Sequence, residues 1–216
     1  MLTNQMPETA VSGSEGSASG NAFTYRRRKV VALFCDLRGF TSFADTAEPE
    51  EILALLRGYH ERLGPLIEKH EGSVYHYFGD GVMLLFNDRD TVADAALRAA
   101  RLAIEMRAAV GLFTRQLGET GRSLGFGVGI AEGHAVLAHI GCKGSAVYTA
   151  IGRVINLASR LCGEALDGQI LVSNRVARAT EGAVDLEPLG QRLLRGFSKP
   201  VSVSNVQAAP PKPRPS

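Results

Sequence analysis

The sequence has no tryptophan, three cysteines and no apolar stretch long enough to cross a membrane. Its longest evident apolar run, Val30 to Cys35, is far shorter than the roughly 20 residues that a spanning helix needs. Met1 to Gly20 is polar and lacks both the basic start and the apolar centre of a signal peptide. We therefore expect a cytoplasmic protein without membrane insertion.

The cysteines and the charge exclude further classes. Cys35, Cys142 and Cys162 are odd in number and their spacing fits no common metal motif, so we expect reduced, buried or half-buried thiols. A net charge of +2 is too small to favour nucleic acid as a partner. With 216 residues, of which 45% are hydrophobic, the chain has room for one well-buried core, and a second is not expected.

The two ends differ in composition from the middle of the chain. Residues 1–24 are rich in small polar residues without periodicity, which predicts a disordered N-terminal tail. Residues 208–216 are rich in proline and are expected to form an extended tail. Residues 25–207 are therefore predicted to be a single domain.

Hydrophobic periodicity predicts the order of elements within that domain. Residues 30–36 are typical of a buried strand, and residues 49–70 of an amphipathic helix that begins at Pro49. Two short apolar runs around Asp80-Gly81 predict a β-hairpin. Further along, we expect a helix over 91–117, two strands that meet at Glu132-Gly133, a helix over 155–165, a strand over 169–173 and short strands as far as Val206.

This order indicates an α+β fold with a ferredoxin-like βαββαβ core and additional C-terminal strands and helices. Right-handed crossovers place the second hairpin strand antiparallel beside the first strand of the domain. The hairpin turn then lies next to the end of that first strand. Asp36 and Asp80, which are far apart in the sequence, are therefore expected to converge.

Each aspartate has a simple local explanation when it is taken alone. Asp80 belongs to a common turn pair, and Asp36 stands where a strand ends. Together they form a hard, all-oxygen site that suits Mg²⁺ or Mn²⁺ when a bound phosphate supplies the remaining ligands. Gly39 follows the first aspartate, and a glycine before a helical turn lets successive backbone N–H groups face an anion.

Three segments of the sequence resemble the signature segments of class III adenylyl and guanylyl cyclases. They are FCDLRGFT at 34–41, YFGDGVMLLF at 77–86 and AIGRVINLASRL at 150–161, in the family's order and spacing. The resemblance extends over about residues 28–206. It implies that Asp36 and Asp80 bind two divalent cations, Mg²⁺ or Mn²⁺, and that the backbone around Phe40 and Thr41 holds the β- and γ-phosphates.

The same resemblance assigns roles on the predicted helix. Asn156 and Arg160 are four residues apart and therefore project from one helix face, which by itself would fit a solvated polar stripe. In the family, the asparagine orients the ribose and the arginine contacts the α-phosphoryl group, within the site of the other subunit. This implies a homodimer with two shared sites. Arg195 stands where the family usually has a lysine that contacts the terminal phosphates.

The residues that would recognise the base depart from the usual pattern. His76 occupies the position of the lysine found in adenylyl cyclases, whereas Thr149 fits one adenylyl subgroup. Both side chains can donate and accept, so the pair fits adenine or guanine, and His76 could also point away and pack beside its tyrosine neighbours. ATP is the expected substrate, with GTP or a pyrimidine nucleotide as the alternatives.

The resemblance thus predicts an adenylate cyclase that makes 3′,5′-cyclic AMP and pyrophosphate for signalling. The alternative from another class is a non-catalytic nucleotide-binding module on the same fold. No sensory segment is visible, so we expect regulation through the dimer interface, the tails or an unidentified regulatory partner.

Overall fold

In the computed structural model of the chain, the described residues are 25–88, 93–118, 124–142 and 144–207. Both predicted tails, 1–24 and 208–216, lie outside them. No helix in this part of the chain is long and apolar enough to span a membrane.

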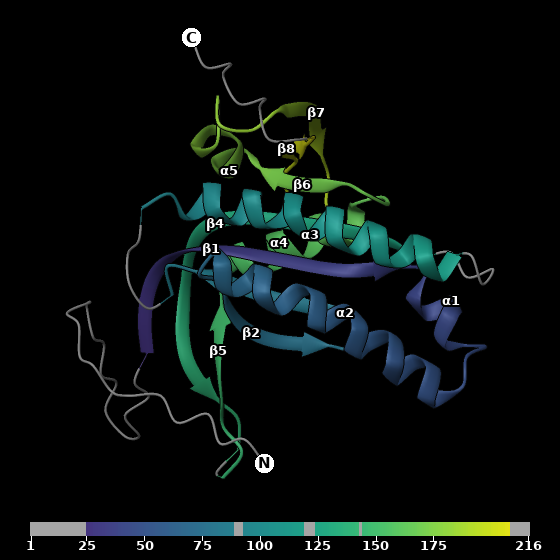
Figure 1. The fold of residues 1–216 in the computed structure, drawn as a ribbon. Coiled ribbons are helices and arrows are strands. Elements are labelled where there is room, and N and C mark those ends of the chain that lie inside the picture. The colour runs from purple at the N-terminus through teal and green to yellow at the C-terminus, as the bar shows by residue number, and fades with distance from the viewer. Residues whose placement is uncertain (1–24, 89–92, 119–123, 143, 208–216) are drawn as a thin grey trace.

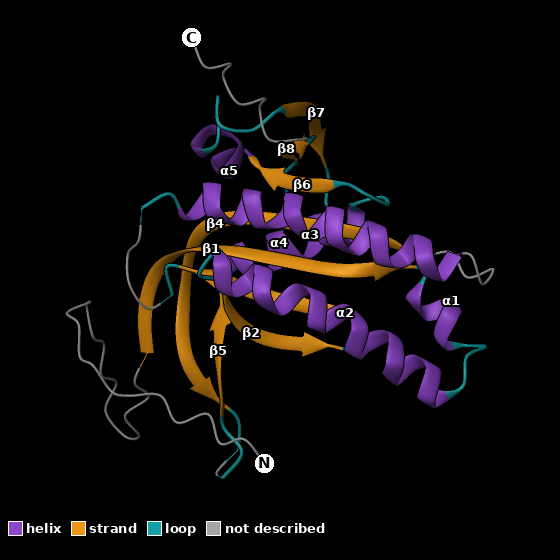
Figure 2. Ribbon diagram, in the orientation of Figure 1, coloured by secondary structure: helices purple, strands orange, loops and turns teal. Residues whose placement is uncertain are grey.

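A mixed sheet forms the centre of the described domain, and helices lie on both of its faces (Figures 1 and 2). Its strands are β1 (Tyr25–Arg38), β2 (Ser73–Phe78), β3 (Gly81–Phe86), β4 (Gly125–Ile140), β5 (Val147–Ile151), β6 (Ile170–Ser173), β7 (Leu186–Arg192) and β8 (Val201–Val206). The helices are α1 (Phe40–Ala44), α2 (Pro49–Lys69), α3 (Ala95–Gly118), α4 (Arg153–Glu164) and α5 (Asn174–Ala179).

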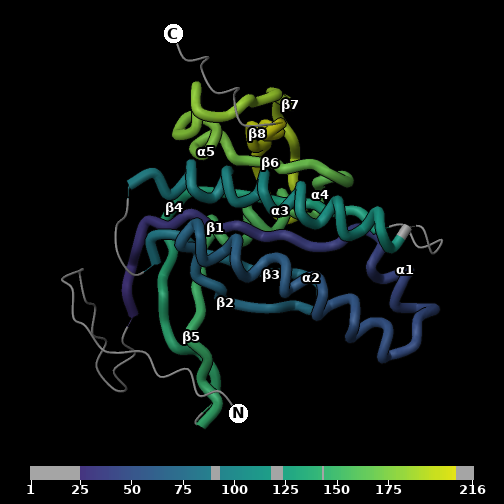
Figure 3. The backbone as a smooth tube through the Cα atoms, viewed as in Figure 1, coloured from purple at the N-terminus to yellow at the C-terminus, as the bar shows by residue number. Residues whose placement is uncertain are grey.

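The predicted βαββαβ core is confirmed. The strands lie in the order β2-β3-β1-β4-β6-β8-β7, and β5 pairs with β4. β1 is antiparallel to both β3 and β4, whereas β4 and β6 are parallel. In Figure 3, β1 and β4 run side by side, consistent with a pairing that extends from Tyr25 to Arg38.

Alternate residues of β1 belong to two separate apolar cores. Val31, Leu33 and Cys35 lie in the core under α2 and α3. Val30 and Ala32 lie in the core under α4. Because successive side chains of a strand point to opposite faces, one apolar run supports helices on both sides of the sheet. This explains why residues 30–35 are continuously apolar rather than alternating.

The start of α2 follows from its sequence. Glu48 caps the helix in a capping box with Glu51, whose carboxylate accepts the Glu48 N–H at 3.1 Å. Pro49 takes the first helical position, where its missing N–H costs nothing. Leu55, Tyr59 and Leu63 then form part of its buried face.

The prediction of two strands around Glu132-Gly133 was wrong, because β4 passes through this pair without a turn. Glu132 and Gly133 pair with Val31 and Val30 of β1, and Glu132 also forms an ion pair with Lys29. A Cβ at Gly133 would lie 3.2 Å from Cβ of Val154. The glycine therefore makes room for α4 and does not turn the chain.

Smaller differences concern the ends of elements and one thiol. β1 begins at Tyr25 and so includes the basic residues before the apolar run. The short helices α1 and α5 were not predicted. Cys142 is exposed, contrary to expectation, whereas Cys35 and Cys162 are buried as free thiols.

Candidate active site

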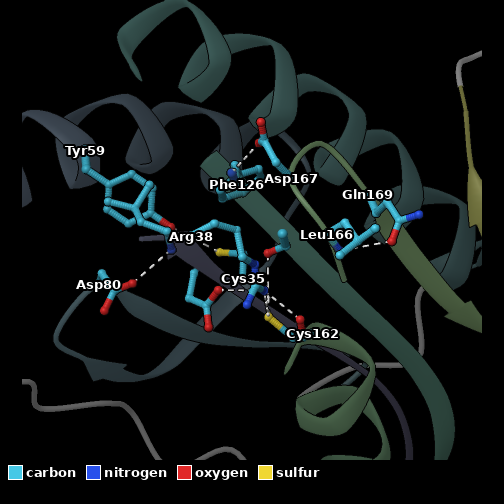
Figure 4. Close-up of polar contacts among 12 residues, drawn as sticks. Cys35, Arg38, Tyr59, Asp80, Phe126, Cys162, Leu166, Asp167 and Gln169 are labelled. Carbon is cyan, nitrogen blue, oxygen red and sulfur yellow. Dashed lines mark hydrogen bonds and ion pairs between the residues drawn. The ribbon is translucent and has the colours of Figure 1, made fainter. Parts of the chain in front are cut away.

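The end of β1 and the β2–β3 turn bring the two predicted metal-binding aspartates together. Asp80 lies in the turn, and its Oδ2 accepts the backbone N–H of Leu37 at 2.9 Å, directly after Asp36 (Figure 4). This contact joins the hairpin turn to the end of the first strand. The predicted convergence of Asp36 and Asp80 is therefore seen in the fold.

Burial raises the pKa of both carboxyl groups above the ordinary value. For Asp36, the Arg38 guanidinium opposes this effect, and the nearby Asp80 charge adds to it. For Asp80, backbone N–H groups, including that of Leu37, lower the pKa but do not cancel the effect of burial. Two half-buried carboxylates of like charge at one place favour a bound cation.

Several features of the pair fit a divalent metal. Asp36 Oδ1 is buried without a directed hydrogen bond, although Arg38 Nη2 lies 2.7 Å away as an ion-pair partner. Among the described residues, no group of three or more His, Cys, Asp or Glu side chains is arranged to hold a metal. A metal at the two carboxylates would therefore need further ligands, such as the phosphate oxygens of a nucleotide.

The segment after Asp36 has the geometry of an anion-facing turn. Gly39 has φ 80°, a left-handed conformation that favours glycine, and it precedes α1. Phe40 is half-buried against the main core and contacts Phe43, so Thr41 lies exposed beside a fixed position. The first backbone N–H groups of a helix have no carbonyl partner within it, which leaves them available to a phosphate.

Asn156 and Arg160 lie exposed on α4, whose other face is buried in the second core. Residues two positions apart on a helix point about 200° away from each other. Cys162 faces β1 and β4, because its buried Sγ donates to the carbonyl of Gly127 at 3.6 Å and lies 3.5 Å from Arg38 Nη2. Arg160 therefore faces away from the aspartates of its own chain.

Arg38 is a site residue that sequence reasoning missed. Its Nη2 contacts both Asp36 Oδ1 and the Cys162 carbonyl, and in Figure 4 it lies between β1 and α4. The signal in the sequence was the run of alternating glycines, Gly125, Gly127 and Gly129. Such spacing leaves one face of a strand bare, and a close neighbour can then lie on it.

The strands that carry His76 and Thr149 approach each other. The rings of Tyr75 and Tyr148, each adjacent in sequence to one of them, have centroids 6.0 Å apart. His76 Nδ1 lies 2.9 Å from the Tyr75 carbonyl oxygen, and its ring packs beside Phe78 with centroids 5.0 Å apart. In this conformation the His76 side chain contacts residues of its own strand, β2. This is close to the alternative in which His76 packs beside its neighbours and does not contact the base.

Arg195 is exposed in the connection between β7 and β8, next to the buried Leu194 and before Gly196, which has φ 84°. Within the described residues, no hydrogen bond or ion pair joins it to Asp36 or Asp80. The structure thus fixes the backbone at Arg195 but does not bring its side chain to the carboxylate pair.

Comparison with known proteins connects this arrangement to a family. Residues 24–205 match the family described as the adenylate and guanylate cyclase catalytic domain. The chain belongs to this family. The match includes both aspartates, the glycine turn after β1 and the whole of α4, so the predicted class III cyclase resemblance is confirmed.

Two curated relatives and two solved structures illustrate the similarity of this cyclase domain. It is 36% identical over 176 residues to an adenylate cyclase of Anabaena cylindrica, and 29% identical over 183 residues to adenylate cyclase 1 of Rhizobium meliloti (strain 1021). These alignments cover 78% and 83% of the chain, but only 34% and 28% of the relatives. The chain therefore spans about a third of the length of these proteins.

The structural matches cover nearly all of the compared chains. The adenylyl cyclase CyaB from P. aeruginosa superposes with a TM-score of 0.81 at 31% identity, over 86% of this chain and 96% of that one. The guanylyl cyclase Cya2 superposes with a TM-score of 0.78, also at 31% identity, over 87% and 95%. The fold of the cyclase domain is thereby shown, whereas the sequence identity is the same, 31%, to an adenylyl and to a guanylyl cyclase.

Proposed function

We propose that a homodimer of this chain converts ATP to 3′,5′-cyclic AMP and pyrophosphate. The observation that carries the proposal is the convergence of Asp36 and Asp80 at the end of β1, within a domain of the cyclase family. The ribose 3′-oxygen would form a bond to the α-phosphorus as the bond from that phosphorus to the pyrophosphate oxygen breaks. Positioning and charge stabilisation supply most of the acceleration in such transfers.

The two aspartates would hold two Mg²⁺ or Mn²⁺ ions, which neutralise phosphate charge and activate the attacking oxygen when they are bound. The backbone at Phe40 and Thr41 would bind the β- and γ-phosphates, and Arg195 would add a positive charge to them. Asn156 would orient the ribose. Arg160 suits the α-phosphoryl group because its guanidinium is permanently charged and presents a rigid fork of donors.

The orientation of α4 supports a site shared between two subunits. Since Arg160 faces away from the aspartates of its own chain, it can serve an aspartate pair only in another copy. Large apolar side chains also remain exposed on β2 and on the β4–β5 hairpin. On β2 they are Val74, Tyr77 and Phe78, and on the hairpin they are Ile140, Val147, Tyr148 and Ile151. The two segments approach each other where the ring centroids of Tyr75 and Tyr148 lie 6.0 Å apart, and exposed apolar surface of this kind is typical of an interface.

ATP is the first candidate because the two curated relatives are named adenylate cyclases. GTP is the second candidate because a guanylyl cyclase structure is as similar in sequence as the adenylyl one. His76 and Thr149 can pair with either base, provided that His76 rotates away from the Tyr75 carbonyl. The cytoplasmic location and the regulatory partner stay predictions.

The proposal is tested by incubating the purified chain with Mn²⁺ and each of the four ribonucleoside triphosphates, and by identifying products by mass. Cyclic AMP with release of pyrophosphate is the expected main product. If cyclic GMP is the main product, the substrate is GTP and not ATP. Binding of ATP without turnover, over a range of metals and pH, would identify a non-catalytic module and overturn the proposal.

A further inference from the structure

Arg38 makes two contacts that belong to different parts of the molecule. Its Nη2 lies 2.7 Å from Asp36 Oδ1 and donates to the carbonyl of Cys162 at 2.6 Å. Asp36 is half of the carboxylate pair, whereas Cys162 lies in the last turn of α4. One guanidinium therefore connects the metal-binding carboxylate with the helix that carries Asn156 and Arg160.

The bare face of β4 holds this guanidinium in place. Gly127 pairs with Asp36 across the sheet, and a Cβ at Gly127 would overlap Nη2 and Nε of Arg38. The guanidinium therefore lies flat on the strand, between Gly127 and α4. Its side chain is about one quarter exposed, so the ion pair with Asp36 is partly shielded from water.

The C-terminal end of α4 is itself fixed to β4. At Gly129 an added Cβ would overlap the backbone of α4 and would lie 2.8 Å from Cα of Cys162. After the helix, Asp167 Oδ1 accepts the Phe126 N–H at 2.9 Å, as Figure 4 shows. The contact of Arg38 with Cys162 therefore acts on a firmly packed helix. Arg160 lies on the same helix, two residues before Cys162.

We propose that Arg38 is a positioning residue that serves both active sites of the dimer, holding Asp36 for one site and helix α4 for the other. The inference rests on the proposed function, since α4 completes the partner's site only if sites are shared. Arginine suits this place because its planar guanidinium lies against Gly127 while Nη2 contacts both oxygens, a fit that the compact, strongly hydrated ammonium of lysine does not reproduce.

The two contacts also compete. Whatever binds Asp36 Oδ1 draws that oxygen away from the guanidinium, and the guanidinium then turns more fully to the Cys162 carbonyl. Binding at Asp36 in one site therefore changes the contact between Arg38 and α4, the helix that completes the other site.

A dimer with a single working site separates these two effects. In a mixed dimer of Asp36→Ala and Arg160→Ala chains, the first chain supplies α4 and the second supplies the carboxylates. The working site therefore lies between them, and the other site lacks both Asp36 and Arg160. Arg38→Met can then be added to either chain, with turnover and Mn²⁺ affinity measured on purified mixed dimers.

Arg38→Met in the carboxylate chain is expected to strengthen Mn²⁺ binding, measured by electron paramagnetic resonance without nucleotide, because a competing positive charge leaves Asp36 Oδ1. It is also expected to lower kcat, because Asp36 is no longer held in place. The expected loss of kcat is roughly 10- to 100-fold, as is usual for a residue that orients a metal ligand. In the helix chain, the same change is expected to lower kcat by about tenfold, with Mn²⁺ affinity unchanged, because there it touches only α4.

Two further variants guard against a trivial loss of folding. Gly127→Ala displaces the guanidinium without removing it, and should reproduce both effects because only a flexible side-chain end must move. Arg38→Lys should restore part of the activity. Arg57→Met, at an exposed position of α2, is the matched control and should change neither quantity. Thermal unfolding and dimer content are measured for every variant.

The possible outcomes distinguish the two proposals. If Arg38→Met acts only in the carboxylate chain, Arg38 serves Asp36 alone and the inference is overturned, while the proposed function stands. If it acts in neither chain, both contacts are dispensable and the inference also fails. If the mixed dimer of Asp36→Ala and Arg160→Ala chains shows no turnover although the wild-type homodimer is active, the shared site itself is wrong.

Discussion

The two halves of the candidate site are built in different ways. The carboxylate half is completed within one chain, because Asp80 bonds to the backbone beside Asp36 and Arg38 lies against Asp36. The half on α4 is held only through the buried face of the helix. Its buried face packs on β4, while Asn156 and Arg160 project into solvent.

The two halves also differ in their effect on the stability of the fold. Holding two carboxylates in a half-buried place costs stability, since burial raises their pKa. Exposed polar side chains on a helix cost almost nothing. A single chain therefore bears the cost of burying the carboxylate pair, whereas Asn156 and Arg160 are displayed at no comparable cost.

The largest expected effect is on activity at the carboxylate half. Asp36→Asn should lower turnover by at least roughly 10³-fold, since a metal contributes several kcal/mol to such reactions. The same variant should unfold at a higher temperature than the wild type at neutral pH in the presence of a chelator. The raised pKa of Asp36 means that its stabilising contribution is complete below the unfolded-state pKa and is lost as pH rises through the folded-state pKa.

Calorimetry and the turnover assay together check this expectation. Asp185→Asn, at an exposed position before β7, is the control and should change neither quantity. Undiminished turnover in Asp36→Asn would contradict the metal assignment. A lower unfolding temperature would instead show that the ion pair with Arg38 outweighs the cost of burial.

The next effect tests the half on α4. Arg160→Ala should lower turnover by roughly 10²- to 10³-fold, as expected when a donor to developing charge is removed. The free energy of unfolding should change by less than about 0.5 kcal/mol because the side chain is exposed. Denaturant unfolding checks this, with Arg178→Ala on α5 as the control. A parallel loss of stability and turnover would mean that Arg160 has a structural role, and the contrast between the halves would disappear.

The smallest effect concerns the packing that aims α4. Gly129→Ala should destabilise the fold by about 1–3 kcal/mol, because a methyl group there meets the helix backbone and no flexible side-chain end can yield. At Gly163, within α4, nothing lies within 4 Å of an added Cβ. Gly163→Ala should therefore stabilise the fold by about 0.4–1 kcal/mol. Equal midpoints in urea for the two variants would contradict the close approach of α4 to β4.

The carboxylate half could be predicted from the sequence because it depends on local rules. A strand, a crossover helix and a hairpin with an Asp-Gly turn suffice to bring Asp36 and Asp80 together. The Glu132-Gly133 error has the same origin. The Glu-Gly pair favours a turn when it is considered locally, but the long pairing of β4 with β1 overrides this preference.

The attachment of α4 to the carboxylate half could not be predicted because it depends on distant packing. The contact of Arg38 with Cys162 joins two ends of the domain, and it exists only because α4 lies on the glycines of β4. The conformation of His76 depends on its contacts with the Tyr75 carbonyl and the Phe78 ring. Neither leaves a periodic signal in the sequence.

The unequal burial of the three thiols has a practical consequence. Burial raises the pKa of Cys35 to about 12 and that of Cys162 further still, so neither forms the reactive thiolate at neutral pH. Cys142 is exposed between β4 and β5, near the apolar side chains of that hairpin. A maleimide spin label would therefore attach at one position without any cysteine being mutated, and the separation of two such labels would report how the copies assemble.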